Sequence, residues 1–361
     1  MHVGGFTAPG FEPVRAVFAE VVAERAGGAG LAVIQDGRCL IELWGGTSDE
    51  AGGRHWQRDT LVMPYSVTKA FVAVTALQLV DRGRLDLDAP AQRYWPQLRT
   101  PTTLRELLSH QSGLVALDEP VPTEAFYDWD LLCGLLAEQA PAWAPGTAHG
   151  ESALFYGHLI GEIVRRVDGR RTGQLLREEI CGPAALDFHI GLDDGQQART
   201  ADLVGFAEFE GDQRRVLGKP ELYRRATGNP PGNLNPDVVN SRRWRAAEIP
   251  AINGHGTAAA VAGFYDLLHR GRLLSPDLLA EATRVQSAGV DRVFGSPNSW
   301  GLGFGLDPDG FGMGGLGGNW GGVSISGGYA LSFLTSGLGD HDRVTRLENV
   351  VRERLGLSPV G

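Results

Sequence analysis

A serine and a lysine three residues apart, Ser66 and Lys69, open a run of mostly apolar residues. Residues three apart on a helix share a face, so the Lys69 amine is expected beside the Ser66 hydroxyl. A serine hydroxyl becomes nucleophilic only when a base takes its proton, and burial can lower the pKa of a lysine until its neutral amine does so. A helix N-terminus would also direct the Ser66 backbone N–H toward a developing oxyanion.

The Ser-x-x-Lys spacing alone is a weak signal, because a helix-capping serine followed by a solvated lysine is more common. Five longer stretches change the balance: Leu61–Ala70, Gly83–Pro90, Thr103–Leu114, Trp143–Thr147 and Leu159–Val164. In combination they make the sequence similar to the serine β-lactamase and penicillin-binding-protein superfamily. The resemblance is closest to class C β-lactamases and the related family VIII type esterases, and it covers nearly the whole chain.

This resemblance implies an antiparallel sheet flanked by helices and an acyl-enzyme formed on Ser66, with Lys69 beside it. It also implies a tyrosine that works as a base with the lysine, in a second motif. At that place this sequence has Glu151. Tyr156 follows five residues later and is expected to face elsewhere.

Glu151 in place of the tyrosine changes the expected chemistry. A carboxylate beside Lys69 favours the protonated lysine, which can no longer accept a proton. Glu151 would then serve as the base itself, directly or through a water molecule. The alternative is a merely structural ion pair in an inactive site. We favour the active role, because buried ion pairs are unfavourable to keep for stability alone.

The third motif of the superfamily carries a lysine or histidine where this sequence has Met313, within a glycine-rich run that includes Gly315. The backbone near Leu316 is expected to donate the second oxyanion N–H, since that role needs no side chain. The superfamily's cation helps to hold the carboxylate of a β-lactam antibiotic, which Met313 cannot do. We therefore predict a neutral ester, thioester or amide substrate, and neither antibiotic hydrolysis nor cell-wall peptidase activity.

Two histidines are weighed as further residues of the site. His149 lies two residues before Glu151, and His255 lies in a glycine-flanked segment expected to be a loop facing the cleft. A lone histidine is more often a structural residue, and His110 and His158 are interpreted in that way. No grouping of His, Asp or Glu has metal-ligand spacing, and no glycine-rich run has a nucleotide-binding pattern, so no metal and no cofactor are predicted.

The elements that position these residues form an α+β fold by their order along the chain. A hairpin is expected from Gly30–Gln35 and Arg38–Trp44, joined by Asp36-Gly37. Helices are expected over 66–81, 104–108, 154–167 and 342–355, and strands over 302–306, 322–326 and 329–335. We predict one catalytic domain, 1–361, with a sheet from about 15–60 and 300–361 and a helical region over about 61–299.

Composition limits the partners of this domain. The formal net charge of −10 argues against nucleic acid and anionic membranes as partners. Three cysteines and an N-terminus without a secretion-signal pattern lead us to expect a cytoplasmic protein. The expected partner is a small-molecule acyl substrate, with an amine or alcohol acceptor as an option. The oligomeric state does not follow from the sequence.

Four functions fit these residues, in decreasing order. The first is a serine hydrolase acting on an ester or amide through acyl-Ser66. The second is an acyltransferase of secondary metabolism that passes the same acyl group to an acceptor. The third is an enzyme without an acyl intermediate that moves protons with Glu151 and His149. The last is a catalytically inactive binding protein.

Overall fold

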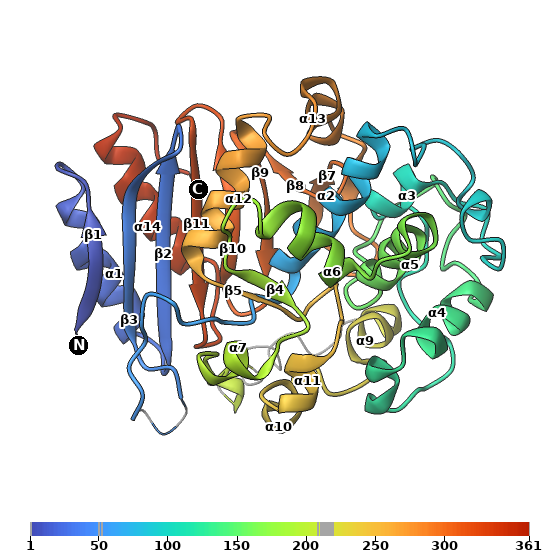
Figure 1. The fold of residues 1–361 in the computed structure, drawn as a ribbon, viewed down its shortest axis with the longest axis horizontal. Helices are drawn as coiled ribbons and strands as arrows, with labels where there is room; N and C mark the ends of the chain where they lie inside the picture. The colour runs from blue at the N-terminus through green and yellow to red at the C-terminus, as the bar shows by residue number, and fades with distance from the viewer. Residues whose placement is uncertain (1, 50, 52, 208, 210–219, 361) are drawn as a thin grey trace.

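The computed structural model describes residues 2–49, 51, 53–207, 209 and 220–360. Within these residues, nine strands form one sheet in the order β1-β3-β2-β11-β10-β9-β8-β7-β6, and every neighbouring pair is antiparallel. Their bounds are β1 Val3–Thr7, β2 Gly28–Gln35, β3 Arg38–Gly46, β6 Ser287–Val290, β7 Pro297–Trp300, β8 Gly305–Asp307, β9 Gly310–Gly315, β10 Asn319–Ser324 and β11 Tyr329–Thr335. Both ends of the chain build this sheet (Figure 1), which confirms the α+β prediction.

Strands β2 and β3 form the expected hairpin. Gln35 pairs with Arg38, so the loop contains only Asp36 and Gly37. Both loop residues have positive φ, 51° and 76°, as a tight primed turn requires.

Helices cover both faces of the sheet. Helices α1 (Glu12–Ala23) and α14 (Asp342–Arg354) contact each other and pack on one face. Helix α12 (Ala258–His269) packs on β2, β10 and β11 from the other side. The helix expected over 342–355 is α14, and its buried residues Val344, Leu347 and Val351 pack in one apolar cluster with residues of the sheet.

The region between the two parts of the sheet is mostly helical and lies at the right of Figure 1. Its α-helices are α2 Thr68–Asp81, α3 Leu104–Leu108, α4 Trp129–Glu138, α5 Tyr156–Asp168, α6 Thr172–Leu176, α7 Asp194–Ala198, α9 Glu221–Gly228, α10 Pro236–Val239, α11 Arg242–Ala246 and α13 Pro276–Ala282. Segments of 3₁₀ helix are η1 Tyr65–Val67, η2 Ala91–Arg93 and η3 Thr123–Tyr127, and η4 Arg177–Cys181 is a turn of π-helix. Strands β4 (Phe188–Ile190) and β5 (Gly254–Gly256) pair with each other in this region.

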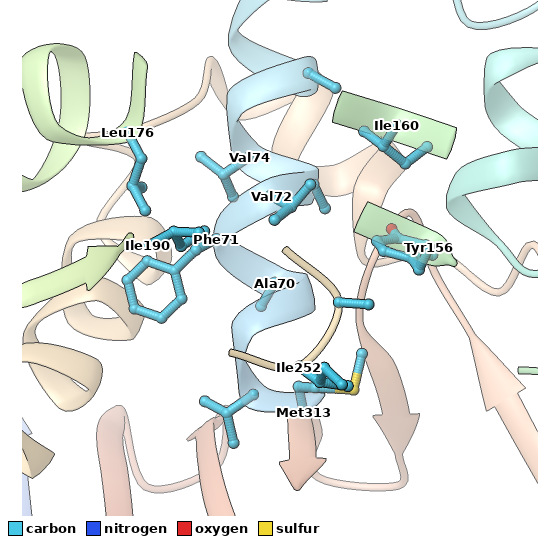
Figure 2. Close-up of a cluster of buried hydrophobic side chains, with 14 of the residues drawn as sticks. Ala70, Phe71, Val72, Val74, Tyr156, Ile160, Leu176, Ile190, Ile252 and Met313 are labelled. Atoms are coloured by element: carbon cyan, nitrogen blue, oxygen red, sulfur yellow. The ribbon is translucent and has the colours of Figure 1, made fainter. Parts of the chain in front are cut away.

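Helix α2 is the centre of the main apolar core. Residues 68–77 and Leu79 are all buried, so this helix has almost no solvent-facing side. Figure 2 shows Tyr156 and Ile160 on one side of α2, and Leu176 and Ile190 on the other. Packing on all sides fixes the start of α2, where Lys69 lies.

The sheet departs from the prediction at both edges and in its glycine-rich part. It starts earlier, at β1, and it gains β6 and β7 before residue 300. The strand expected over 302–306 is instead β8, Gly305–Asp307, and β9 has no counterpart in the prediction. Four of the six residues of β9 are glycines, which give no alternation of polar and apolar side chains, so the sequence did not mark this strand. In the described part of the chain, no helix has the length and apolarity needed to span a membrane.

Candidate functional site

The nucleophile candidate lies in a strained turn. Ser66 is in η1, directly before α2, rather than within the α-helix that the sequence predicted. The preceding residue, Tyr65, has a φ of +48°, which is unusual for a bulky side chain. The Tyr65 hydroxyl donates to the Asn233 carbonyl at 2.9 Å, and this bond joins the turn to another segment that lines the cavity.

Lys69 lies directly beside Ser66, as the three-residue spacing predicted. Its Nζ is 2.6 Å from Ser66 Oγ and 3.2 Å from the carbonyl oxygen of Ala251. The side chain is fully buried. This burial lowers the pKa of Lys69, while the Glu151 carboxylate acts in the opposite direction.

Glu151 completes a three-residue cluster with Ser66 and Lys69. Its Oε1 is 3.1 Å from Lys69 Nζ and 3.4 Å from Ser66 Oγ. The side chain is 16% exposed, so it reaches the cavity while the lysine does not. The structure therefore brings together the three residues that the sequence proposed as catalytic.

The C-terminal end of β9, beyond its pairing with β8, lies beside this cluster. Met313, Gly315 and Leu316 all line the same cavity as Ser66. Gly315 lies so close to η1 that a Cβ atom there would stand 2.0 Å from the Pro64 carbonyl oxygen. Only glycine permits this approach, which holds the predicted oxyanion strand against the turn that carries Ser66.

The cavity has a volume of about 880 Å³. Aromatic side chains form much of its wall, among them Tyr223, Phe294, Trp300 and Trp320. Arg224 and Asp307 bring one positive and one negative side chain to the same wall. This volume fits a drug-sized molecule, and the lining suits one that is largely apolar.

His149 does not reach the cavity, contrary to the expectation that it binds substrate there. The described residues that line the cavity include Asn298 but not His149. Asn298 Oδ1 is 2.7 Å from His149 Nε2. His149 is buried behind that amide. Its hydrogen bond to Asn298 argues against a proton-transfer pair made of Glu151 and His149.

His255 was expected in a loop facing the cleft, and this expectation is wrong. The residue lies in β5, opposite His189 of β4, and is 1% exposed. Burial lowers the pKa of His255 to about 3, so the ring is neutral. The glycine-flanked segment is buried because β5 pairs with β4, which lies far away in the sequence. No local signal in the sequence indicates this pairing.

Tyr156 and His110 have structural places, as predicted. The Tyr156 hydroxyl is buried and donates to the Leu108 carbonyl at 3.2 Å. The His110 ring packs on Tyr156 and Trp300, with centroids 4.8 and 4.4 Å away. Burial and the nearby Lys69 charge hold the pKa of His110 well below its usual range.

Sequence reasoning missed several residues of the site. His341, from the start of α14, lines the cavity, and a Cβ on Gly314 would stand 3.0 Å from its Nε2. Trp320 and Asn298 also line the cavity. None of these belongs to a local motif, so only the fold reveals them. Within the described residues, no group of three or more His, Cys, Asp or Glu side chains is arranged to hold a metal ion.

Known proteins are similar to this chain in both sequence and fold. A family model described as Beta-lactamase matches residues 14–354. The chain is 31% identical to Esterase/beta-lactamase LipL of Mycobacterium tuberculosis, over 92% of this chain and 82% of that protein. A solved family VIII carboxylesterase superposes with a TM-score of 0.89 at 32% identity, covering 98% of this chain and 100% of the other. Monacolin J acid methylbutanoyltransferase of Aspergillus terreus is 28% identical over 48% of each chain.

These matches agree with the resemblance found in the sequence motifs. The family model extends from α1 to the end of α14, so it includes both the sheet and the helical region. The chain is an enzyme of the β-lactamase-like serine hydrolase class, and it belongs to the Beta-lactamase family.

Proposed function

We propose that this protein is a serine esterase that forms an acyl-enzyme on Ser66 and uses Glu151 as the base. One observation carries the proposal: the Ser66 hydroxyl lies between Lys69 Nζ at 2.6 Å and Glu151 Oε1 at 3.4 Å. The esterase relatives support the type of reaction. The identity of the base departs from the superfamily pattern, because this chain has Glu151 where the resemblance implies a tyrosine.

A count of hydrogen-bond donors supports Glu151 as the base. An ammonium group has three protons, and Lys69 Nζ has three acceptors: Ser66 Oγ, Glu151 Oε1 and the Ala251 carbonyl. Because Ser66 Oγ accepts from the ammonium, its own proton is free to point toward Glu151 Oε1. Lys69 then acts as a fixed positive charge that orients Ser66 and stabilises the anion formed during attack.

The acylation step follows from this arrangement. Ser66 Oγ bonds to the ester carbonyl carbon while its proton passes to Glu151, and the carbonyl π electrons move to the oxygen. The backbone N–H groups of Ser66 and Leu316 are the proposed donors to this oxyanion. When the intermediate collapses, the C–O bond to the alcohol breaks and Glu151 returns its proton to the leaving oxygen.

Deacylation reverses these roles. Glu151 takes a proton from a water molecule, and the resulting hydroxide bonds to the acyl carbon. The bond between that carbon and Ser66 Oγ breaks, and Oγ regains a proton from Glu151. The products are the free acid and the original enzyme, so no cofactor takes part in the balance.

We further propose a neutral, bulky and largely apolar ester as the substrate. Met313 offers no positive charge for a substrate carboxylate, and the cavity of about 880 Å³ has aromatic walls. Additional apolar contact in such a pocket improves kcat/KM by about tenfold or more. We expect p-nitrophenyl esters with an aromatic acyl group to be hydrolysed with at least about tenfold higher kcat/KM than the acetate.

A panel of p-nitrophenyl esters together with benzylpenicillin tests this proposal. Aromatic esters should give free acid, and benzylpenicillin should be turned over poorly or not at all. Preference for the acetate, or faster hydrolysis of the penicillin, would contradict the proposed substrate class.

Acyl transfer is the second candidate, because the chain matches an acyltransferase over part of its length and the cavity has room for an acceptor. Transfer shares the first half-reaction with hydrolysis. Product analysis by liquid chromatography, with added alcohols and amines, separates the two reactions: acylated acceptor indicates transfer, and free acid alone indicates hydrolysis.

The response of the acylation rate to alkaline pH distinguishes the two possible bases. Burial lowers the pKa of Lys69, so the lysine loses its proton below its ordinary alkaline range. With Glu151 as the base, protonated Lys69 is needed, and the rate should fall as the pH rises through the pKa of Lys69. Stopped-flow acylation rates across the alkaline range check this sign. A rate that rises instead would make neutral Lys69 the base.

A further inference from the structure

A buried carboxylate, Asp291, lies behind Glu151 directly after β6. It is 0% exposed and accepts hydrogen bonds from four N–H groups. Oδ1 accepts from the backbone N–H groups of Val293 and Phe294, both at 2.8 Å. Oδ2 accepts from the Glu151 backbone N–H at 2.9 Å and from Asn298 Nδ2 at 3.1 Å. Four donors around two oxygens are the arrangement expected of an ionised carboxylate.

The same carboxylate fixes the direction of a hydrogen-bond chain to His149. An ionised Asp291 can only accept, so the Asn298 amide must turn its Nδ2 toward Asp291. Asn298 Oδ1 then faces His149 Nε2 at 2.7 Å, and the proton of that bond belongs to the histidine. Asp291 therefore holds the chain at residue 151 directly and at residue 149 through Asn298.

Glu151 needs such support because it lies outside any helix or strand. The backbone N–H of Gly150 donates to the His110 carbonyl at 3.0 Å, and that of Ser152 donates to His110 Nδ1 at 3.2 Å. The N–H of Glu151 itself goes to Asp291. Of the backbone N–H groups of residues 150, 151 and 152, only that of Glu151 donates to an ionised side chain.

We propose that Asp291 is a positioning residue, which holds the Glu151 carboxylate within reach of Ser66 Oγ. This inference rests on the proposed role of Glu151 as the base. A displacement of about 1 Å at a catalytic group can lower a rate by about 10²-fold. Asp291 belongs to a segment 140 residues away from Glu151 in the chain, so the two are joined only by the fold.

Asp291→Asn tests the proposal with little change of shape. Whichever way the new amide turns, its NH₂ group faces N–H donors that the carboxylate had accepted. We expect the rate constant for acylation by a p-nitrophenyl ester to fall by about 10- to 100-fold. In a Glu151→Gln background, where no base remains to be positioned, the same substitution should change the acylation rate by less than about twofold.

Asp266→Asn is the matched control. Asp266 is also a buried carboxylate, which accepts a hydrogen bond from the Gly37 backbone N–H and pairs with Arg270. These three residues are not among the described residues that line the cavity. Replacement of Asp266 should lower Tm without slowing acylation. If Asp291→Asn does not fold, Asn298→Ala removes one of the four bonds to Asp291, and a smaller loss that disappears in the Glu151→Gln background is expected.

The outcomes separate the two proposals. If Asp291→Asn leaves acylation unchanged, or slows it equally in the parent and in the Glu151→Gln background, Asp291 does not act through Glu151 and the inference is overturned. If Glu151→Gln alone leaves acylation unchanged, the proposed function fails, whatever Asp291 does. If Glu151→Gln slows acylation, and Asp291→Asn slows it in the parent but not in the Glu151→Gln background, both the proposed function and the role of Asp291 are supported.

Discussion

Replacing Glu151 with Gln is expected to lower the rate of Ser66 acylation by about 10²- to 10⁴-fold. The amide has almost the same shape and can still accept a hydrogen bond from Lys69 Nζ, but it cannot take the Ser66 proton. The measurement is the burst of p-nitrophenol in stopped-flow experiments, with circular dichroism to confirm folding. The loss should appear in the rate constant of the burst rather than in substrate affinity.

Glu151→Tyr is the informative companion, because the family resemblance implies a tyrosine at this place. A phenol beside Lys69 would restore the tyrosine and lysine that act together as the base in the superfamily. This variant should therefore acylate faster than Glu151→Gln. Parent-like acylation in Glu151→Gln would show that the Glu151–Lys69 contact is only structural. Lys69 would then be the remaining candidate for the base.

Ser66→Ala is expected to reduce ester turnover by at least about 10⁴-fold. No other hydroxyl takes the place of Oγ between Lys69 and Glu151 in the described structure, and Lys69 keeps its contacts with Glu151 and Ala251. Steady-state hydrolysis of the preferred aryl ester measures the effect, with Tm as a check on folding. Nearly full activity in this variant would favour the proton-transfer enzyme without an acyl intermediate.

The core of the candidate site was predictable because its signals are local. Ser66 and Lys69 are joined by helical spacing, and Glu151 was found as the departure from a motif. The structure brings these three together within 3.4 Å. Gly315 and Leu316 line the cavity, and the resemblance pointed to them through the third motif of the superfamily.

The rest of the site depends on contacts between distant segments. His255 was expected in a loop, but it lies in β5, which pairs with the distant strand β4. His149 lies behind Asn298, which lines the cavity in its place. Asp291 and Asn298 carry no motif, although they connect to residues 149 and 151. Strand β9 has four glycines among its six residues, so no alternation could reveal it before the structure did.

Intact-mass spectrometry tests directly whether Ser66 forms an acyl-enzyme. The parent enzyme and Ser66→Ala are each incubated with an activated aryl ester and with a serine-directed phosphonate, and the mass of the whole chain is then measured. We expect an increment of one acyl or phosphonyl group on the parent, and none on Ser66→Ala. An unmodified parent under both reagents, or equal labelling of the two proteins, would contradict acyl-enzyme chemistry at Ser66.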